Sequence, residues 1–386
     1  MIGCRFETGD RPYGVVRIGV RLATHLPRTL RWGLAGLTLA LAACSPAVDD
    51  AGCTLTFQRI TTLEPPPGDE GFPEYFNVSA ELPGGLRAVM LVQGGEFPLL
   101  LFDTAGRFVD TLGGRGSGPG EYLRPELVLR YRRDSIIVLD RANGRATVLD
   151  STYRVARSFP MTFPVIWGAA LADGSLALSH GTGARRRVGR YGPEGAPLDS
   201  PPWSYERLVG GSREDPWLHV GAELDGTWWT LSLNLRFEFR RYDGRDSLLA
   251  DWTFPPELLP PHEEDLIRTP TRPPQPSIWS AVVDRQNRLW TFAAIADSQW
   301  AEGLGPAESG EGGQEFHPTT DRHALYDGLV IVSETATGRV LASWRLDSLP
   351  GSPIEPGVLL TGTEDDDGWF HPELRRPVPS SACGLE

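Results

Sequence analysis

Short apolar runs that end in aspartate and are followed by turn residues recur along this chain. Residues 99–150 contain two such runs, LLLFD and SIIVLD, and each precedes a Gly or Asn-Gly turn and a further strand-like segment. A glycine-rich connector separates the two runs. Strand-length apolar runs bounded by turn residues predict antiparallel β-meanders that repeat along the chain.

The same signal, turn residues followed by a short apolar run, occurs six times. Successive occurrences are about 40 to 80 residues apart, and the shorter spacings match the roughly 40–50 residues of one four-stranded propeller blade. Most signals are followed by a hairpin, which we expect to form the outer two strands of a blade. The six signals begin at Gly84-Gly85, Asp134, Asp173-Gly174, Asp225-Gly226, Asn287 and Asp367-Gly368.

The last of the six units is one strand short. It begins near Gly357 and runs out of chain after one outer strand near residues 378–385, whereas residues 53–60 (CTLTFQRI) have the alternation of a strand. We therefore predict an all-β fold: a six-bladed β-propeller of four-stranded antiparallel blades, closed by an N-terminal strand that completes the last blade. The predicted blades span residues 76–113, 122–159, 165–201, 217–254, 277–347, and 357–386 together with 53–63.

The connector at Gly114 to Pro125, GRGSGPGEYLRP, lies between FDTAGRFVDTLG and DSIIVLDRANGRATVLD. This combination resembles six-bladed β-propeller proteins related to NHL-repeat and TolB-like propellers, many of which are bacterial lipoproteins. The resemblance is clear over about two blades, and the other blades are degenerate. It implies the fold, and the family carries no shared catalytic motif that transfers to positions of this chain.

The N-terminal region has the features of an export signal. Arg28 and Arg31 flank the start of an apolar stretch that ends in Leu41-Ala42-Ala43-Cys44. This resembles a bacterial lipoprotein signal, which implies that residues 1–43 are removed, that Cys44 is lipidated, and that residues 44–52 form a tether to a domain over 53–386. The alternative is a plain secretory signal with a coincidental cysteine. A spanning helix is disfavoured, because the apolar run is shorter than the roughly 20 residues a bilayer requires.

The charge balance restricts the partners. The chain has a formal charge of −13, and removal of residues 1–43, which hold six Arg and two acidic residues, leaves 31 Arg, 48 acidic residues and a charge of −17. Such a balance argues against nucleic acid as a partner and against electrostatic docking on anionic lipid. The membrane contact is therefore expected through the lipid on Cys44, where several acyl chains would hold stably.

Cysteine positions predict a covalent link between the chain ends. Of the four cysteines, Cys4 lies in the removed segment and Cys44 is assigned to lipid, which leaves Cys53 and Cys383. An exported compartment permits a disulfide between them. This pairing places the two ends of the domain side by side, in agreement with the closure predicted from the strand pattern.

No segment carries a recognisable catalytic or metal-binding motif. The glycine run Gly113–Gly120 is followed by Glu121-Tyr122 and not by Lys-Ser/Thr, so we interpret it as an inter-blade connector and not a phosphate loop. The acids of residues 364–367 do not have the spacing of a calcium loop and are expected to face water. A third cluster has a His-x₅-His spacing that is loose for a zinc site, and we do not expect it to bind metal. It contains Glu315, His317, Asp321 and His323.

The predicted first strands offer mainly aromatic and small residues: Trp167-Gly168-Ala169, His219-Val220-Gly221 and Trp279-Ser280-Ala281. We expect His219 to bond a neighbouring backbone group. Aromatic residues are expected to pack between blades, with at most two or three exposed for stacking on a ligand. They are Trp203, Tyr205, Trp217, Trp228, Trp229, Trp252, Trp279, Trp290 and Trp300.

Two insertions interrupt the repeat, a Pro-rich one at 255–276 and a Gly- and Glu-rich one at 301–322. Both are predicted to be surface loops on one face, where such proteins place their function. We predict a lipid-anchored, extracytoplasmic binding or scaffold module for an unidentified protein or small molecule, with no cofactor assigned. The alternatives are a channel-site enzyme of the propeller lactonase or lyase type, which rests on fold analogy, and a carbohydrate-binding surface protein, which rests on tryptophan content.

Overall fold

The computed structural model places residues 49–386 in one compact unit. The residues it describes are 52–72, 76–91, 98–132, 134–161, 165–182, 185–198, 218–223, 225–233, 236–262, 273–305, 308–310, 313–315 and 325–385. The predicted signal and Cys44 lie outside these residues. In the described part, no helix has the length and hydropathy that crossing a bilayer requires.

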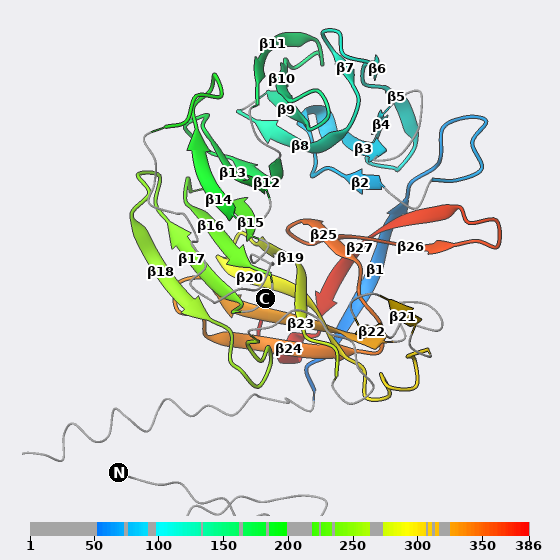
Figure 1. Ribbon diagram of the computed structural model, residues 1–386, viewed down its shortest axis with the longest axis vertical. Coiled ribbons are helices and arrows are strands. Elements are labelled where there is room, and N and C mark those ends of the chain that lie inside the picture. Colours follow the sequence, from blue (N-terminus) through cyan, green and yellow to red (C-terminus); the bar gives the residue numbers. More distant parts are fainter. Residues whose placement is uncertain are drawn as a thin grey trace, which may run out of the picture. The chain divides into compact units, whose positions relative to one another are not determined.

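Antiparallel sheets follow one another along the chain (Figure 1), and the first three form blades 1 to 3. Blade 1 contains β2 (Phe76–Val78), β3 (Arg87–Leu91), β4 (Leu99–Phe102) and β5 (Phe108–Thr111). Blade 2 contains β8 (Pro125–Tyr131), β9 (Ser135–Asp140), β10 (Arg145–Leu149) and β11 (Val155–Pro160). Blade 3 contains β12 (Val165–Ala170), β13 (Leu176–Thr182) and β14 (Arg185–Tyr191), and the described part of a fourth strand is one bridge between Tyr191 and Pro197.

Three further sheets complete the set. Blade 4 contains β15 (Leu218–Ala222), β16 (Trp228–Ser232), β17 (Glu238–Tyr242) and β18 (Leu248–Thr253). Blade 5 contains β19 (Ser277–Val283), β20 (Arg288–Ala296), β23 (Tyr326–Glu334) and β24 (Val340–Leu346). Blade 6 contains β25 (Ser352–Glu355), β26 (Val358–Glu364), β27 (Phe370–Pro379) and the N-terminal strand β1 (Leu55–Thr62).

The first strand of one blade contacts the first strand of the next. Such contacts link β8 to β12, β12 to β15, β15 to β19 and β19 to β25, so the sheets radiate from a ring of first strands (Figure 1). The protein is therefore a six-bladed β-propeller, and the predicted fold class is confirmed.

The middle strands of a blade are apolar on both faces because a neighbouring blade packs on each. All four residues of β4 are buried, as are five of the six residues of β9 and eight of the nine of β23. A continuous apolar run is what a strand covered on both sides requires. The outer strand β11 has one buried residue in six, because it borders solvent. This difference explains why the middle strands gave the clearest sequence signals.

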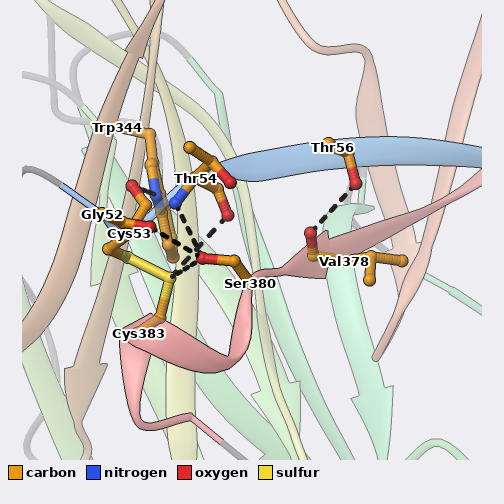
Figure 2. The surroundings of a disulfide bond; sticks show 8 residues. All are labelled: Gly52, Cys53, Thr54, Thr56, Trp344, Val378, Ser380 and Cys383. Carbon is orange, nitrogen blue, oxygen red and sulfur yellow. Dashed lines mark hydrogen bonds between the residues drawn. A yellow bond between two sulfur atoms is a disulfide. The ribbon is translucent and has the colours of Figure 1, made fainter.

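The ring closes within blade 6, where the first strand of the domain joins the last. Strand β1 pairs antiparallel with β27, from Leu55 opposite Pro379 to Thr62 opposite Glu373. The Sγ atoms of Cys53 and Cys383 are 2.11 Å apart and their Cα atoms 4.6 Å apart, so the predicted juxtaposition of these cysteines is confirmed. Figure 2 shows Ser380 between the two chain ends.

Hydrogen bonds support this seam. The Oγ atom of Ser380 accepts from the backbone N–H of Thr54 at 3.0 Å and donates to the carbonyl of Gly52 at 3.1 Å (Figure 2). The Oγ1 of Thr56 donates to the carbonyl of Val378 at 3.2 Å. Apolar packing adds to these bonds, because Leu55 and the disulfide lie against a buried cluster of blade 5.

The disulfide stands where the other blades have a turn. Strands 3 and 4 of blade 5 are joined by a turn after Glu334, and Trp252 of blade 4 donates its Nε1–H to the carbonyl of Thr335 in that turn at 3.0 Å. In the same way, Trp344 of blade 5 donates to the carbonyl of Cys53 at 3.2 Å (Figure 2). The chain ends of blade 6, joined by the disulfide, therefore take the place of the turn between strands 3 and 4. The carbonyl of Cys53 also accepts the hydrogen bond from blade 5 that such a turn would accept.

Blade 6 departs in detail from the sequence pattern. Its first strand β25 begins at Ser352, before the predicted start at 357, and the signal at Asp367-Gly368 precedes the third strand of the blade and not the second. After Pro379 the chain forms a 3₁₀ turn, Ser381–Cys383, and not a continued strand. The sequence of β25, SPIE, has no apolar run because it is a short first strand, so the pattern could not reveal it.

Removal of the disulfide is expected to destabilise the propeller. Replacement of Cys53 and Cys383 by Ser releases a loop of 330 residues in the unfolded chain, and should lower the free energy of unfolding by roughly 2–5 kcal/mol. Denaturant unfolding of the double variant and of wild type measures this loss. Reductant should destabilise wild type and leave the double variant unchanged. Equal stability of the two proteins without reductant, or alkylation of unreduced wild type at either cysteine, would contradict the link.

Candidate functional site

Antiparallel topology gives each blade two unlike ends. Connections between strands 1 and 2, and between strands 3 and 4, lie at one end, which we call the turn end. Connections between strands 2 and 3, and those between blades, lie at the opposite end, which we call the loop end. The described chain starts and finishes at the turn end of blade 6, since β1 begins opposite the last residues of β27.

Several turns at the turn end are short and are held by an aspartate carboxylate. The Oδ1 of Asp103 accepts from the backbone N–H groups of Ala105 at 2.9 Å and of Arg107 at 3.0 Å. The Oδ1 of Asp243 accepts from Arg245 and Ser247 in the same way, each at 2.8 Å. These carboxylates are occupied by their own turns, as expected for Asx-type turns. The turn end is therefore closed by local hydrogen bonds.

The loop end carries the long connections. The connection from β18 to β19 spans 254–276 and that from β20 to β23 spans 297–325, so both predicted insertions leave blades 4 and 5 at this end. Within the second, β21 (Glu308–Gly310) pairs with β22 (Gly313–Glu315) in a small hairpin. The loop end of these blades is the candidate functional site, because two long connections join the rigid strands there.

Two carboxyl groups, those of Asp297 and Asp327, lie together where the connection from β20 to β23 leaves these strands. Asp327 is buried and accepts from the Nε of Arg345 at 2.6 Å. Burial raises the pKa of Asp327, the hydrogen bond from Arg345 opposes this, and a hydrogen bond with Asp297 raises the pKa of Asp327 further. The Oδ1 of Asp297 also accepts from the N–H of Gln299 at 2.5 Å. No local sequence pattern connects Asp297 with Asp327, because only the pairing of β20 with β23 brings them together.

His219 lies among first strands from three blades. Its ring centroid is 5.1 Å from that of Trp167 on β12 and 5.3 Å from that of Trp229 on β16. The backbone N–H of Ala281 on β19 donates to Nδ1 at 3.3 Å, so the expected backbone bond is confirmed. Burial lowers the pKa of His219 to about 4, which keeps the ring neutral with its proton on Nε2. His219 is thus a structural residue between blades.

Carboxylates on the first strands are paired with arginine. Glu126 on β8 contacts Arg124 at 2.9 Å and Arg141 at 3.5 Å. Glu355 on β25 pairs with Arg87 of blade 1. Among the described residues, no group of three or more His, Cys, Asp or Glu is arranged to hold a metal ion. A metal-dependent channel enzyme needs several metal-binding side chains that converge in the channel, and the described residues of the first strands show no such group.

The glycine-rich connector is a rigid link between blades 1 and 2. It contains the short parallel pair β6 (Gly114–Arg115) and β7 (Glu121–Tyr122). The Arg145 guanidinium donates to the carbonyls of Ser117 at 2.9 Å and Gly118 at 2.6 Å. The Glu121 carboxylate accepts from the N–H of Gly118 at 2.7 Å, which occupies a donor that a phosphate would need. The structure thus agrees with a connector and not a phosphate loop.

Two further candidate clusters are described to different extents. In the acidic turn 364–367, Asp365 accepts from the N–H of Trp369 at 2.9 Å and lies 2.8 Å from Nε2 of His371. Of the zinc-like cluster, Glu315 ends β22 and its side chain is not described. The other three members, His317, Asp321 and His323, lie outside the described residues.

The described aromatic residues pack inside the protein. Trp228 stacks on Tyr242 with centroids 4.4 Å apart, and Trp252 stacks on Phe239 at 4.7 Å. Of the nine aromatics singled out from the sequence, Trp203, Tyr205 and Trp217 lie outside the described residues and the other six are buried or half-buried. The described part thus shows no exposed aromatic platform for a sugar among them.

Comparison with known proteins supports the fold. A model of the DUF5128 family, described as a 6-bladed beta-propeller, matches residues 93–155, which contain the connector and its supports. No curated protein matches the sequence.

Two solved structures share the fold at low sequence identity. A DUF4221 family member from Bacteroides vulgatus is 11% identical, with a TM-score of 0.56 and coverage of 85% of this chain and 99% of its own. A Bacteroides fragilis protein, described as a candidate exported protein, is 12% identical, with a TM-score of 0.51 and coverage of 87% and 98%. At these identities the likeness concerns the fold alone.

The lowered pKa of His219 predicts a pH-dependent stability. Because its folded pKa of about 4 lies below the ordinary histidine pKa of 6.5, the unfolded chain binds the proton more readily, and stability falls as the pH is lowered from about 6.5 towards 4. His219→Asn should reduce the loss of unfolding free energy between pH 7 and pH 5 by on the order of 1–2 kcal/mol. Denaturant unfolding at both pH values measures it, and identical losses in the two proteins would contradict it.

Proposed function

We propose that this protein is a lipid-anchored, extracytoplasmic β-propeller that binds a protein or small-molecule ligand through the loop end of blades 4 and 5. The observation that carries the proposal is the emergence of both long connections, 254–276 and 297–325, at the same end of the ring. Both connections begin and end at strands of the closed propeller, which is rigid. Such an arrangement is typical of binding surfaces built from loops on a scaffold.

Export is supported by two independent features. The bonded cysteines Cys53 and Cys383 suit an oxidising compartment, where disulfides persist. The solved structure from Bacteroides fragilis with the same fold is described as a candidate exported protein. With the lipoprotein-like stretch at 28–44, these features favour attachment through Cys44, as in the lipoproteins related to NHL-repeat and TolB-like propellers that the connector resembles.

The lipid anchor is tested at Cys44. In cells fed an alkynyl fatty acid, the wild-type chain should acquire the label and fractionate with membranes, whereas Cys44→Ser should lose both properties. The Cys53→Ser/Cys383→Ser variant is the matched control, because it removes cysteines without touching the lipidation position, and should keep the label. Absence of label on wild type, or its persistence on Cys44→Ser, would reject lipidation.

The ligand-binding loop end is tested by crosslinking in native membranes. A photoreactive amino acid in place of the exposed Glu302, in the long connection of blade 5, should yield adducts of defined mass. The same residue in place of the exposed Arg154, at the turn end of blade 2, should yield about tenfold less, since binding surfaces concentrate contacts in one patch. Similar adducts at both positions would count against a loop-end site.

A further inference from the structure

A small recess, open to solvent on one side, lies between blades 2 and 3 at the loop end. It is bordered by the first strands β8 and β12, which are neighbours in the ring, by the connection from β9 to β10, and by the segment that links the two blades. None of its lining residues belongs to the long connections of blades 4 and 5. Its lining includes Glu126, Asp140, Arg141, Arg145, Met161 and Val165.

One of the two carboxylates that line the recess has an oxygen atom available. The oxygens of Asp140 are occupied, since they accept from the backbone N–H groups of Leu123 at 2.8 Å and Arg124 at 3.1 Å. Glu126 has 18% of its side chain exposed, and its contacts with Arg124 at 2.9 Å and Arg141 at 3.5 Å both use Oε1. Within the described part of the chain, Oε2 of Glu126 has no hydrogen-bond donor. This oxygen can therefore accept from a ligand.

Two guanidinium groups also line the recess. Arg145 is fixed by the carbonyls of the glycine-rich connector and forms no ion pair with a described carboxylate. Arg141 has 46% of its side chain exposed, and the one hydrogen bond that its side chain makes to a described residue, to Glu126 at 3.5 Å, is long. Since a guanidinium carries five N–H donors, Arg141 can donate to a ligand in the recess.

The balance of charge favours an uncharged ligand group. A ligand carboxylate would lie beside Glu126, a ligand ammonium would lie beside Arg141, and each would lose hydration without a matching gain. A primary amide avoids both costs, because its carbonyl accepts from Arg141 and its NH₂ donates to Oε2 of Glu126. The half-buried Met161 and the buried Val165 offer apolar contacts to the methylene group that carries the amide.

We infer that the recess between blades 2 and 3 binds the side-chain amide of an Asn or Gln residue of a protein partner, with Glu126 as the acceptor and Arg141 as the donor. Because the recess is small, it suits one side-chain head group of a larger partner. The inference goes beyond the proposed site at blades 4 and 5, since it uses different residues on the same end of the ring.

Three small molecules of one shape test the choice of an amide. Acetamide is uncharged, whereas acetate and acetamidinium carry a negative and a positive charge. Met161 reports occupancy, because the other methionines are Met1 and Met90, and Met90 is buried in a cluster between blades 1 and 2. In full-length protein with ¹³C-labelled methionine methyl groups, acetamide should shift the Met161 resonance saturably and leave that of Met90 in place.

The dissociation constant of acetamide should be at least about tenfold lower than that of acetate or acetamidinium, since a charged group loses hydration beside a like charge. The resonance is assigned with Met161→Leu. Absence of a saturable shift at Met161, or equal affinity for the three molecules, would overturn the inference.

Single neutral substitutions test the two named roles. Glu126→Gln leaves the positive charges in excess, so acetate should bind at least about threefold more tightly than acetamide, and Arg141→Gln should favour acetamidinium in the same way. Glu238→Gln is the matched control, because Glu238 has 16% of its side chain exposed and pairs with Arg240 in blade 4. An unchanged order of affinities in either variant, or the same reordering in the control, would overturn the roles. Circular dichroism and the unfolding midpoint verify the fold of each variant.

The protein partner is tested by crosslinking beside the recess. Leu123 is 40% exposed, and its N–H binds the lining residue Asp140. A photoreactive residue in its place should form protein adducts in native membranes, and Glu126→Gln with Arg141→Gln should lower their yield at least about fivefold, since the amide loses both of its partners. An unchanged yield would overturn the inference.

Adducts at Glu302 separate this inference from the proposed function. If Glu302 forms adducts and acetamide does not bind, the recess is rejected and the site at blades 4 and 5 stands. If acetamide binds beside Met161 and Glu302 forms no adducts, the recess stands and the site at blades 4 and 5 is rejected.

Discussion

The pairing of β1 with β27 is the interaction on which the ring depends. Each blade of the propeller covers its neighbours on both sides, so a gap at one seam would expose apolar faces of two blades at once. Segments from the two ends of the domain close this gap through strand pairing, the bond between Cys53 and Cys383, which are 330 residues apart, and apolar packing on blade 5. The disulfide acts where chain connectivity is absent, because it takes the place of the turn that joins strands 3 and 4 in blades 1, 2, 4 and 5.

Side chains of one blade donate hydrogen bonds to backbone carbonyls at the turn end of the next blade. Trp252 reaches a turn of blade 5, Trp344 reaches the seam of blade 6, and Arg190 of blade 3 donates to the carbonyl of Gly244 in a turn of blade 4. Two turns and the seam thus accept a hydrogen bond from the blade before, so these parts of the turn end are committed to structure.

Much of the fold could be predicted from the sequence, because each strand and turn is marked by a short stretch of residues. Middle strands such as β4 and β9 are continuous apolar runs, since they are covered on both faces, and aspartate and glycine mark the turns that follow. The short strand β25 escaped detection because four residues with a proline carry no periodicity. The Asp297–Asp327 pair escaped for another reason: the two residues meet only through the pairing of β20 with β23.

By itself the sequence determined the all-β repeat, the number of blades and the candidate cysteine pair, because turn chemistry, strand period and the small number of cysteines are properties of short segments or simple counts. Tertiary structure decided which groups meet. It placed His219 between tryptophans of two blades, engaged the carboxylates of the first strands with arginine, and paired strands from opposite ends of the chain. These outcomes depend on packing between blades, which brings together residues that no local pattern connects.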